Sequence, residues 1–254
     1  MRFYLICKKC KDMAKGDDSD TPTALFPALY TDSSIYEFKC QQGHFNSIVL
    51  KEQLFEVLYE VSAVAYVEGY YRDAVASSSA ALERFYEFVI RLLLSEKIKD
   101  ESIIEKVWKK VSRQSERQLG AYQFLFLSEL AQEPITLSTD TTGLRNKVIH
   151  QGKIPTKLES LHFLEAVYGV IKDVLEVLHD KKYRSAIQRS ISSHEKAVMK
   201  TMGEREYTHL TSGTIITLWN YSKAHYEQPL SVHLKSLIDK QKAITFTNLK
   251  NSSQ

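Results

Sequence analysis

The sequence predicts a mainly α-helical protein: a helical bundle with a small β-structured head before it and a helical extension after it. Three observations predict this fold class. From residue 51 onward, apolar residues recur with the helical period of about 3.6 residues. The chain of 254 residues has only 9 Gly and 5 Pro, too few for an all-β protein with its many turns. The first 50 residues instead contain short alternating runs and all 3 cysteines.

The composition indicates a chain that folds around a core. Hydrophobic residues make up 43% of the sequence and charged residues 26%, which excludes wholesale disorder. No run of apolar residues is long enough for a transmembrane helix, and the apolar stretch at residues 1–6 is too short for a signal peptide. The cysteine count of 3 is odd, which argues against a secreted disulfide scaffold. We therefore expect a cytoplasmic protein with reduced thiols and no membrane partner.

Charge divides the chain into three predicted domains. The head, residues 1–50, carries six basic and six acidic side chains; the bundle, residues 51–180, carries 16 and 20; and the extension, residues 181–254, carries 12 and 5. A basic extension on a globular body suits a polyanionic partner, and it equally fits a solvated helical surface.

The head contains a pattern typical of a zinc ribbon. Cys7 and Cys10 form a CxxC motif after a strand-like run, and Cys40 and His44 follow a second such run about thirty residues later. Each half reads as strand, tight turn, strand, and Gly43 lets the second turn curl. Two ligands from each turn satisfy tetrahedral coordination of a structural Zn²⁺, with no open position for catalysis. The alternative is three unrelated buried cysteines and a surface histidine.

The bundle reads as a series of amphipathic helices. The periodicity predicts helices over residues 51–68, 72–95, 103–111, 118–131 and 158–178, a loop over 134–142, and a short helical turn from Gly143 to Gly152. Small residues at 76–81 would let a neighbouring helix approach closely. In the extension, helices are expected over 181–202, 213–225 and 232–243.

Arg145 and His150 are the pair best suited to chemistry. They lie five residues apart, at the start of a predicted helix, and are expected to project to roughly one side. An arginine neutralises charge on a pentacoordinate phosphorus, and a histidine moves protons near neutral pH. This suits cleavage of RNA, whose own 2′-hydroxyl is the nucleophile. The spacing alone is not specific, since Arg189 and His194 repeat it.

The surroundings of this pair are more specific. Residues 51–180 resemble the HEPN domain, a helical bundle found in ribonuclease toxins, antiviral defence proteins and nucleotide-linked regulators. The resemblance rests on segments 69–75 and 80–83, on the Arg-Asn-x-x-x-His of residues 145–150, and on the long helix that follows. It covers about half of the chain.

The resemblance implies a metal-independent endoribonuclease, in which the motifs of two chains face each other across a homodimer cleft. Its products would carry a 2′,3′-cyclic phosphate and a 5′-hydroxyl. Arg145 and His150 carry over as catalytic residues, Asn146 as the polar residue that orients them, and Glu83 as an acidic residue that points toward the motif. Such a toxin or defence effector has RNA as its substrate and an antitoxin or defence protein as a possible partner.

Two other functions remain open. HEPN proteins that have lost activity serve as scaffolds or regulators, so the chain could be a binding module that docks a protein or nucleic acid. A third possibility is a zinc-ribbon regulator that binds DNA through the basic extension.

Overall fold

Helix α3 (Tyr71–Lys97) is 27 residues long and forms the axis of the helical bundle. The structure, a computed structural model, describes residues 2–14, 25–31, 34–179, 182–202, 208–210, 214–219 and 221–239. Around α3 lie α2 (Leu54–Val67), α4 (Glu101–Val111), α5 (Ser115–Leu130), α6 (Thr139–His150), α7 (Lys157–Leu178) and α8 (Arg184–Met202). The prediction of a mainly helical chain with a small N-terminal β head is confirmed.

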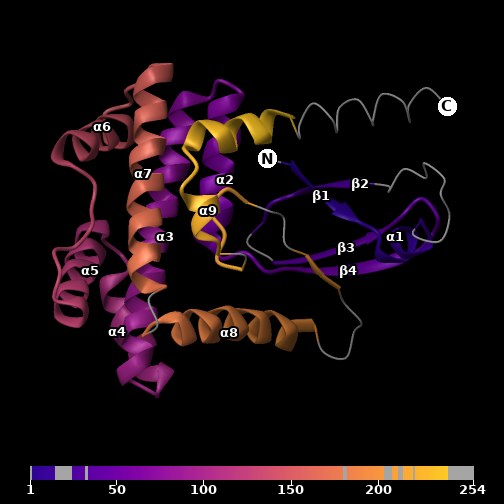
Figure 1. Cartoon of the computed structure of the whole chain (residues 1–254), viewed down its shortest axis with the longest axis horizontal. Helices are drawn as coiled ribbons and strands as arrows, with labels where there is room; N and C mark the ends of the chain where they lie inside the picture. Colours follow the sequence, from indigo (N-terminus) through magenta and orange to yellow (C-terminus); the bar gives the residue numbers. More distant parts are fainter. Residues whose placement is uncertain are drawn as a thin grey trace.

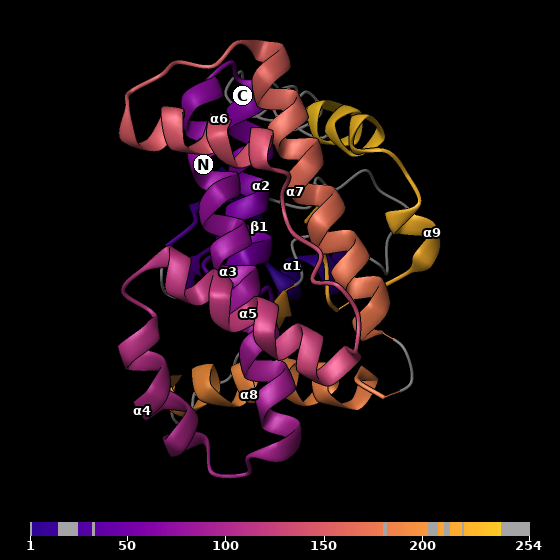
Figure 2. The same ribbon diagram turned by 90° about the vertical axis from the view of Figure 1, so that its left-hand side faces the viewer.

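The helices form a layered arrangement. In Figure 1, α3 and α7 run alongside each other, with α4, α5 and α6 on one side and the strands on the other. Figure 2 views the outer side and shows α6, α5 and α4 following one another down this face, with α8 crossing at the height of α4. Among the described residues, no helix is long and apolar enough to cross a membrane.

The ends of the helices follow from local capping chemistry. Helix α2 ends at Val67, and two residues later Gly69 has a φ of +86°, which glycine readily adopts. Helix α6 begins earlier than predicted, within the expected loop, because the Ser138 side chain accepts a hydrogen bond from the Thr141 backbone at 3.2 Å and caps it. Helix α7 begins with a reciprocal capping box between Thr156 and Glu159.

The head consists of two small β units. Strand β1 (Arg2–Ile6) pairs antiparallel with β2 (Leu25–Leu29), and helix α1 (Lys8–Ala14) follows β1 directly. Strands β3 (Ile35–Lys39) and β4 (Phe45–Leu50) form an antiparallel hairpin. A small core of Leu5, Tyr36, Ile48 and Leu50 includes Val57 of α2, so the head packs directly on the bundle.

The extension differs from the prediction in its middle part. Strand β5 (Thr208–Leu210) adds to the head's sheet, parallel to β4. The predicted helix over 213–225 is wrong for residues 214–219, which are not helical, and a four-residue helix α9 (Lys223–Tyr226) follows them. Residues 230–239 are helical, and the rest of the predicted last helix lies outside the described residues. The division into three domains stays a prediction.

Two buried glutamates of α2 explain why residues 214–219 are not helical. The Glu56 carboxylate accepts a hydrogen bond from the Leu218 backbone at 2.7 Å, and the Glu60 carboxylate accepts one from the Ile215 backbone at 2.9 Å. The backbone N–H groups of Ile215 and Leu218 therefore donate to side chains of α2 and not to carbonyl groups of a helix in their own segment. Glu56 and Glu60 lie one helical turn apart on α2, so they anchor the segment at two points.

The buried carboxyl of Glu56 predicts a pH dependence of stability. Burial raises its pKa to about 8, although hydrogen bonds from Gln53 and Leu218 favour the charged form. The folded chain thus keeps a proton that the unfolded chain releases. This stabilising contribution is fully present below the ordinary glutamate pKa and is lost as the pH rises through about 8.

We expect the free energy of unfolding of the wild type to fall between about pH 5 and pH 8 more steeply than that of Glu56→Gln. Urea denaturation at several pH values measures both slopes. Glu68→Gln, at an exposed position just after α2, is the matched control and should keep the wild-type slope. Parallel slopes for wild type and Glu56→Gln would contradict this assignment.

Candidate metal centre and candidate active site

The four predicted metal ligands converge on one point of the head. Cys7 follows β1, Cys10 lies in α1, and Cys40 and His44 flank the turn between β3 and β4. Their ligand atoms all lie within 4.8 Å of one another. Cys7 and Cys40 are buried, and Cys10 and His44 are partly buried, so the cluster is largely shielded from solvent. Residues 37 positions apart in sequence thus supply one donor set.

The two halves of this site are built differently. The second half is the predicted strand, tight turn and strand: Gly43 has a φ of +80°, and the Cys40 backbone donates to the His44 carbonyl at 2.9 Å. The first half is a strand followed by a helix, which corrects the predicted hairpin. The Lys11 backbone donates to the Cys7 carbonyl at 3.0 Å, a helical bond that places Cys10 in the first turn of α1.

The distances between ligand atoms agree with tetrahedral coordination. Zn–S bonds of about 2.3 Å and Zn–N bonds of about 2.0 Å place ligand atoms about 3.5–3.8 Å apart. The sulfurs of Cys10 and Cys40 lie 3.8 Å apart. Nδ1 of His44 lies 3.4 Å from the Cys10 sulfur and 3.8 Å from the Cys7 sulfur. The cluster therefore has the donors and the size to hold a metal ion such as zinc.

The electrostatics of the thiols favour a cation at the same place. Burial alone raises the pKa of the Cys7 thiol, but hydrogen bonds from the Cys10 backbone and the Asn46 side chain outweigh it and lower the pKa to about 6. Burial and the neighbouring thiols of Cys7 and Cys40 raise the pKa of the Cys10 thiol to about 12. The Cys7 thiol is therefore deprotonated easily, and its negative charge opposes deprotonation of the Cys10 thiol. A divalent cation bound between the sulfurs would remove this repulsion.

The second candidate site is formed by α3 and α6. Nη2 of Arg145 lies 2.5 Å from Oε1 of Glu83, and Nη1 of Arg145 donates to Oδ1 of Asn146 at 3.1 Å. Residues 62 positions apart thus meet, and three of the four predicted catalytic residues lie together. The side chains of Arg145 and Glu83 are 19% and 32% exposed, so the pair is shielded but accessible.

These three residues line a pocket of about 500 Å³ between α3, α5, α6 and the start of α7. Its remaining lining residues are Ser79, Leu82, Tyr86, Ser115, Glu116, Gln118, Leu119, Gln123, Thr136, Leu137, Thr139, Thr142, Gly143 and Phe163. The sequence analysis missed Tyr86 and Gln118 as pocket residues. Tyr86 lies on the apolar face of its helix, where a side chain that lines a pocket cannot be told from one in the core.

His150 is placed apart from this pocket. It is the last residue of α6, its side chain is exposed, and it is not among the pocket's lining residues. The expectation that Arg145 and His150 project to one side is therefore corrected. Five residues of α-helix turn the chain by about 500°, which leaves the two side chains about 140° apart around the axis.

The second Arg–His pair of the sequence lies elsewhere, on α8. Arg189 forms an ion pair with Glu96 of α3. His194 is partly buried, and burial lowers its pKa. Neither residue lines the pocket that contains Arg145.

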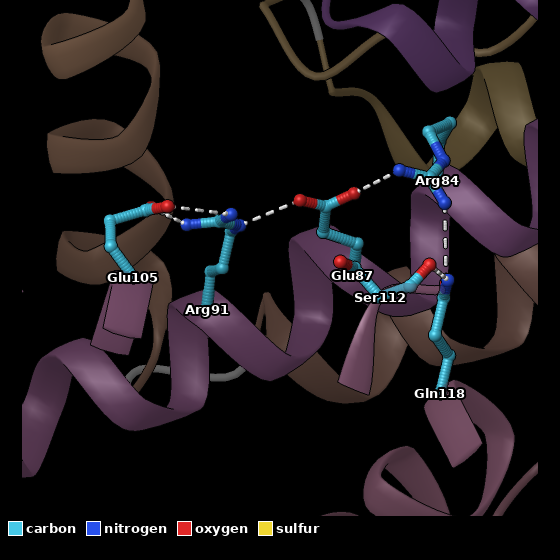
Figure 3. A network of polar contacts seen from close by, with 6 residues as sticks. All are labelled: Arg84, Glu87, Arg91, Glu105, Ser112 and Gln118. Carbon is cyan, nitrogen blue, oxygen red and sulfur yellow. Dashed lines mark hydrogen bonds and ion pairs between the residues drawn. The ribbon is translucent and has the colours of Figure 1, made fainter. Parts of the chain in front are cut away.

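A chain of polar contacts fixes one side of the pocket (Figure 3). Arg91 of α3 bridges Glu105 of α4 and Glu87 of α3, and Glu87 in turn pairs with Arg84. Arg84 donates to the Gln118 side chain at 3.3 Å, and Gln118 donates to the Ser112 carbonyl at 2.7 Å. Gln118 is 3% exposed and lines the pocket, so this network sets the position of α5 relative to α3.

Comparisons of this chain with protein-family models, with curated proteins and with solved structures find no match. The resemblance to the HEPN domain therefore stays a prediction from the sequence.

The donor set predicts that the purified protein contains about one zinc ion per chain, measurable by atomic spectrometry. His44→Ala should lose most of this zinc and unfold at a lower temperature, because three ligands hold the ion less tightly and the head's own core is small. His162→Ala, at an exposed position on α7, is the matched control and should keep the metal. Equal zinc content in the two variants would contradict the site.

Proposed function

We propose that the chain is a metal-independent endoribonuclease of the HEPN type that acts in the cytoplasm as a homodimer, as a toxin or antiviral defence effector. One observation supports it above the others: Arg145, held by Glu83 and next to Asn146, faces an accessible pocket. An arginine held in this way offers a fixed positive charge to a phosphodiester. The resemblance of residues 145–150 to the HEPN motif adds the histidine.

The proposed reaction needs only groups of the protein and the RNA. The 2′-oxygen attacks the adjacent phosphorus while a base takes its proton, and a P–O bond to the 2′-oxygen forms as the bond to the 5′-oxygen breaks. The departing 5′-oxygen receives a proton. His150 moves these protons, and Arg145 stabilises the charge on the phosphorus oxygens. The products are a 2′,3′-cyclic phosphate and a 5′-hydroxyl.

The position of His150 gives the dimer a role in this proposal. Within one chain, His150 does not line the pocket of Arg145. A twofold dimer that brings two α6 helices together would set the His150 of each copy near the Arg145 of the other. The zinc of the head is structural in this proposal, and the basic extension helps to hold RNA.

A non-catalytic binding module is the second candidate, and the ion pair itself favours it. Glu83 neutralises the charge of Arg145, and His150 is exposed on another side of the helix. In this case the pocket would bind a ligand or a partner, and the chain would regulate or scaffold rather than cleave.

Incubation of the protein with total RNA and tRNA, with EDTA present, tests the first candidate. We expect cleavage that leaves 2′,3′-cyclic phosphate ends, and a loss of at least about a hundredfold in rate for both Arg145→Ala and His150→Ala. His162→Ala serves as the matched control, because His162 is exposed on α7 and lies outside the pocket, and it should cleave as the wild type does.

Cleavage at equal rates by His150→Ala and the wild type would exclude the proposed mechanism. If the wild type cuts no RNA but binds RNA or a partner protein, and Arg145→Ala weakens that binding, the binding module is the better description.

A shared site predicts complementation between inactive variants. If the Arg145 of one copy works with the His150 of the other, each dimer that combines Arg145→Ala with His150→Ala subunits has one intact site. After subunit exchange, a mixture of the two variants should regain about a quarter of the wild-type activity, since about half of its dimers are mixed. A mixture that stays inactive, although light scattering and tagged pull-down show mixed dimers, would place both residues in a site of one chain.

A further inference from the structure

The pocket of Arg145 has features that the cleavage chemistry does not use. It measures about 500 Å³, a size typical of sites that enclose a small molecule. Its apolar part includes Leu82, Leu119 and Phe163, and its polar side includes Glu83 and Arg145. A flat molecule with an apolar face and a polar edge fits such a lining.

The hydroxyl of Tyr86 is a polar group that lacks a partner among the described residues. Tyr86 is 5% exposed, it lines the pocket, and its ring stacks on Tyr122 at a centroid distance of 4.3 Å. No described residue forms a hydrogen bond with its hydroxyl, whereas the neighbouring Tyr122 hydroxyl donates to the Ile135 carbonyl at 3.0 Å. The hydroxyl oxygen is not among the fully buried polar atoms without a partner, so it is accessible from the pocket and can form a hydrogen bond with a ligand there.

The ion pair supplies an acceptor directly beside a donor. Oε1 of Glu83 receives the Arg145 guanidinium, and its Oε2 has no partner among the described residues. Arg145 uses one nitrogen for Glu83 and another for Asn146, which leaves several of its five N–H groups for a ligand. The edge of the pocket can therefore accept and donate hydrogen bonds at adjacent points.

The charges in the pocket lining indicate which part of a nucleotide can bind inside it. Glu83 cancels the charge of Arg145, and Glu116 adds a further carboxylate to the lining. A phosphate group inside this pocket would face two carboxylates, whereas a neutral base would not be repelled. The occupant that fits is the base, with the phosphate outside.

Among the bases, guanine matches this edge. Its N7 and O6 acceptors suit an arginine, which binds them in a bidentate manner. Next to O6 it carries the N1–H and N2–H donors, which suit a carboxylate. From the unpaired Tyr86 hydroxyl and the adjoining Glu83 and Arg145 in an apolar-walled pocket, we infer that the pocket binds an unpaired guanine base. As the specificity site of the enzyme this rests on the proposed function, but base binding itself does not require cleavage.

Calorimetric titration of the full chain with the four nucleoside 5′-monophosphates tests the inference directly. GMP should bind with an affinity at least about tenfold higher than AMP, CMP or UMP, and inorganic phosphate should not compete. Inosine monophosphate lacks only the N2 amino group, so it should bind more weakly than GMP. Equal binding of all four nucleotides, competition by phosphate alone, or no saturable binding of GMP would overturn the inference.

Two variants assign the binding to this pocket. Tyr86→Phe removes only the unpaired hydroxyl, so it should keep the wild-type unfolding temperature and lose about tenfold in GMP affinity. Glu83→Gln should lose the preference for GMP over AMP, while Glu68→Gln, at an exposed position outside the pocket, should keep it. Unchanged GMP affinity in both Tyr86→Phe and Glu83→Gln would place any guanine site elsewhere.

The inactive His150→Ala variant separates this inference from the proposed function. It should bind GMP as the wild type does, because His150 does not line the pocket. Cleavage without GMP binding would leave the ribonuclease proposal intact and remove the guanine site. If the wild type binds GMP but cleaves no RNA, the guanine site stands and the ribonuclease proposal is removed.

Discussion

The structure depends on the burial of α3 on several sides at once. This helix contacts α2, α4, α5, α6, α7 and α8, so its sequence must suit all of them. Its first half uses small residues, with Ala74, Ser78 and Ala81 fully buried, and the Ser78 hydroxyl is satisfied by the Ala74 carbonyl at 2.9 Å. Its second half uses larger side chains such as Phe85.

The same helix carries the acidic residue of the candidate site: Glu83 and Tyr86 lie three residues apart and line the same pocket. The wall of the pocket that α3 forms therefore lies directly on the core.

Helix α2 connects the other parts of the chain to this core. Val57 belongs to the head's small core, while Glu56 and Glu60 hold the backbone of residues 214–219. Strand β5, which precedes that segment, pairs with β4 of the head. The head and the extension are thus linked to each other and to the bundle through one helix and one strand. A metal ion that orders the head also orders the partner of β5, so its stabilising effect would extend beyond the head.

The sequence predicted the features that depend on local pattern. Helical periodicity located α2, α3, α4, α5 and α7 because apolar residues recur in each of them with the helical period, and the ligand spacing located all four residues of the metal cluster. It failed where a distant group decides the local structure. Residues 214–219 are apolar enough for a helix, but carboxylates 155 and 162 positions away bind their backbone. A CxxC spacing brings two thiols together both at the start of a helix and in a hairpin turn, so the spacing alone could not distinguish the two structures. The Tyr86 hydroxyl was missed for a related reason, since its lack of a partner appears only in three dimensions.

The ion pair between Glu83 and Arg145 bears on both functions proposed for the pocket. A partly exposed pair of this kind contributes only about 0–1 kcal/mol, because water competes for both charges. Arg145 can therefore leave Glu83 for a phosphate at little cost, so the pair favours a binding module without excluding catalysis. A base whose N–H groups occupy Glu83 would favour that release, since it replaces the guanidinium as the partner of the carboxylate. Because a guanidinium has five N–H groups, Arg145 can bind O6 and N7 of the base with two of them and face a phosphate outside the pocket with others, which couples recognition of the RNA to the arginine that acts on it.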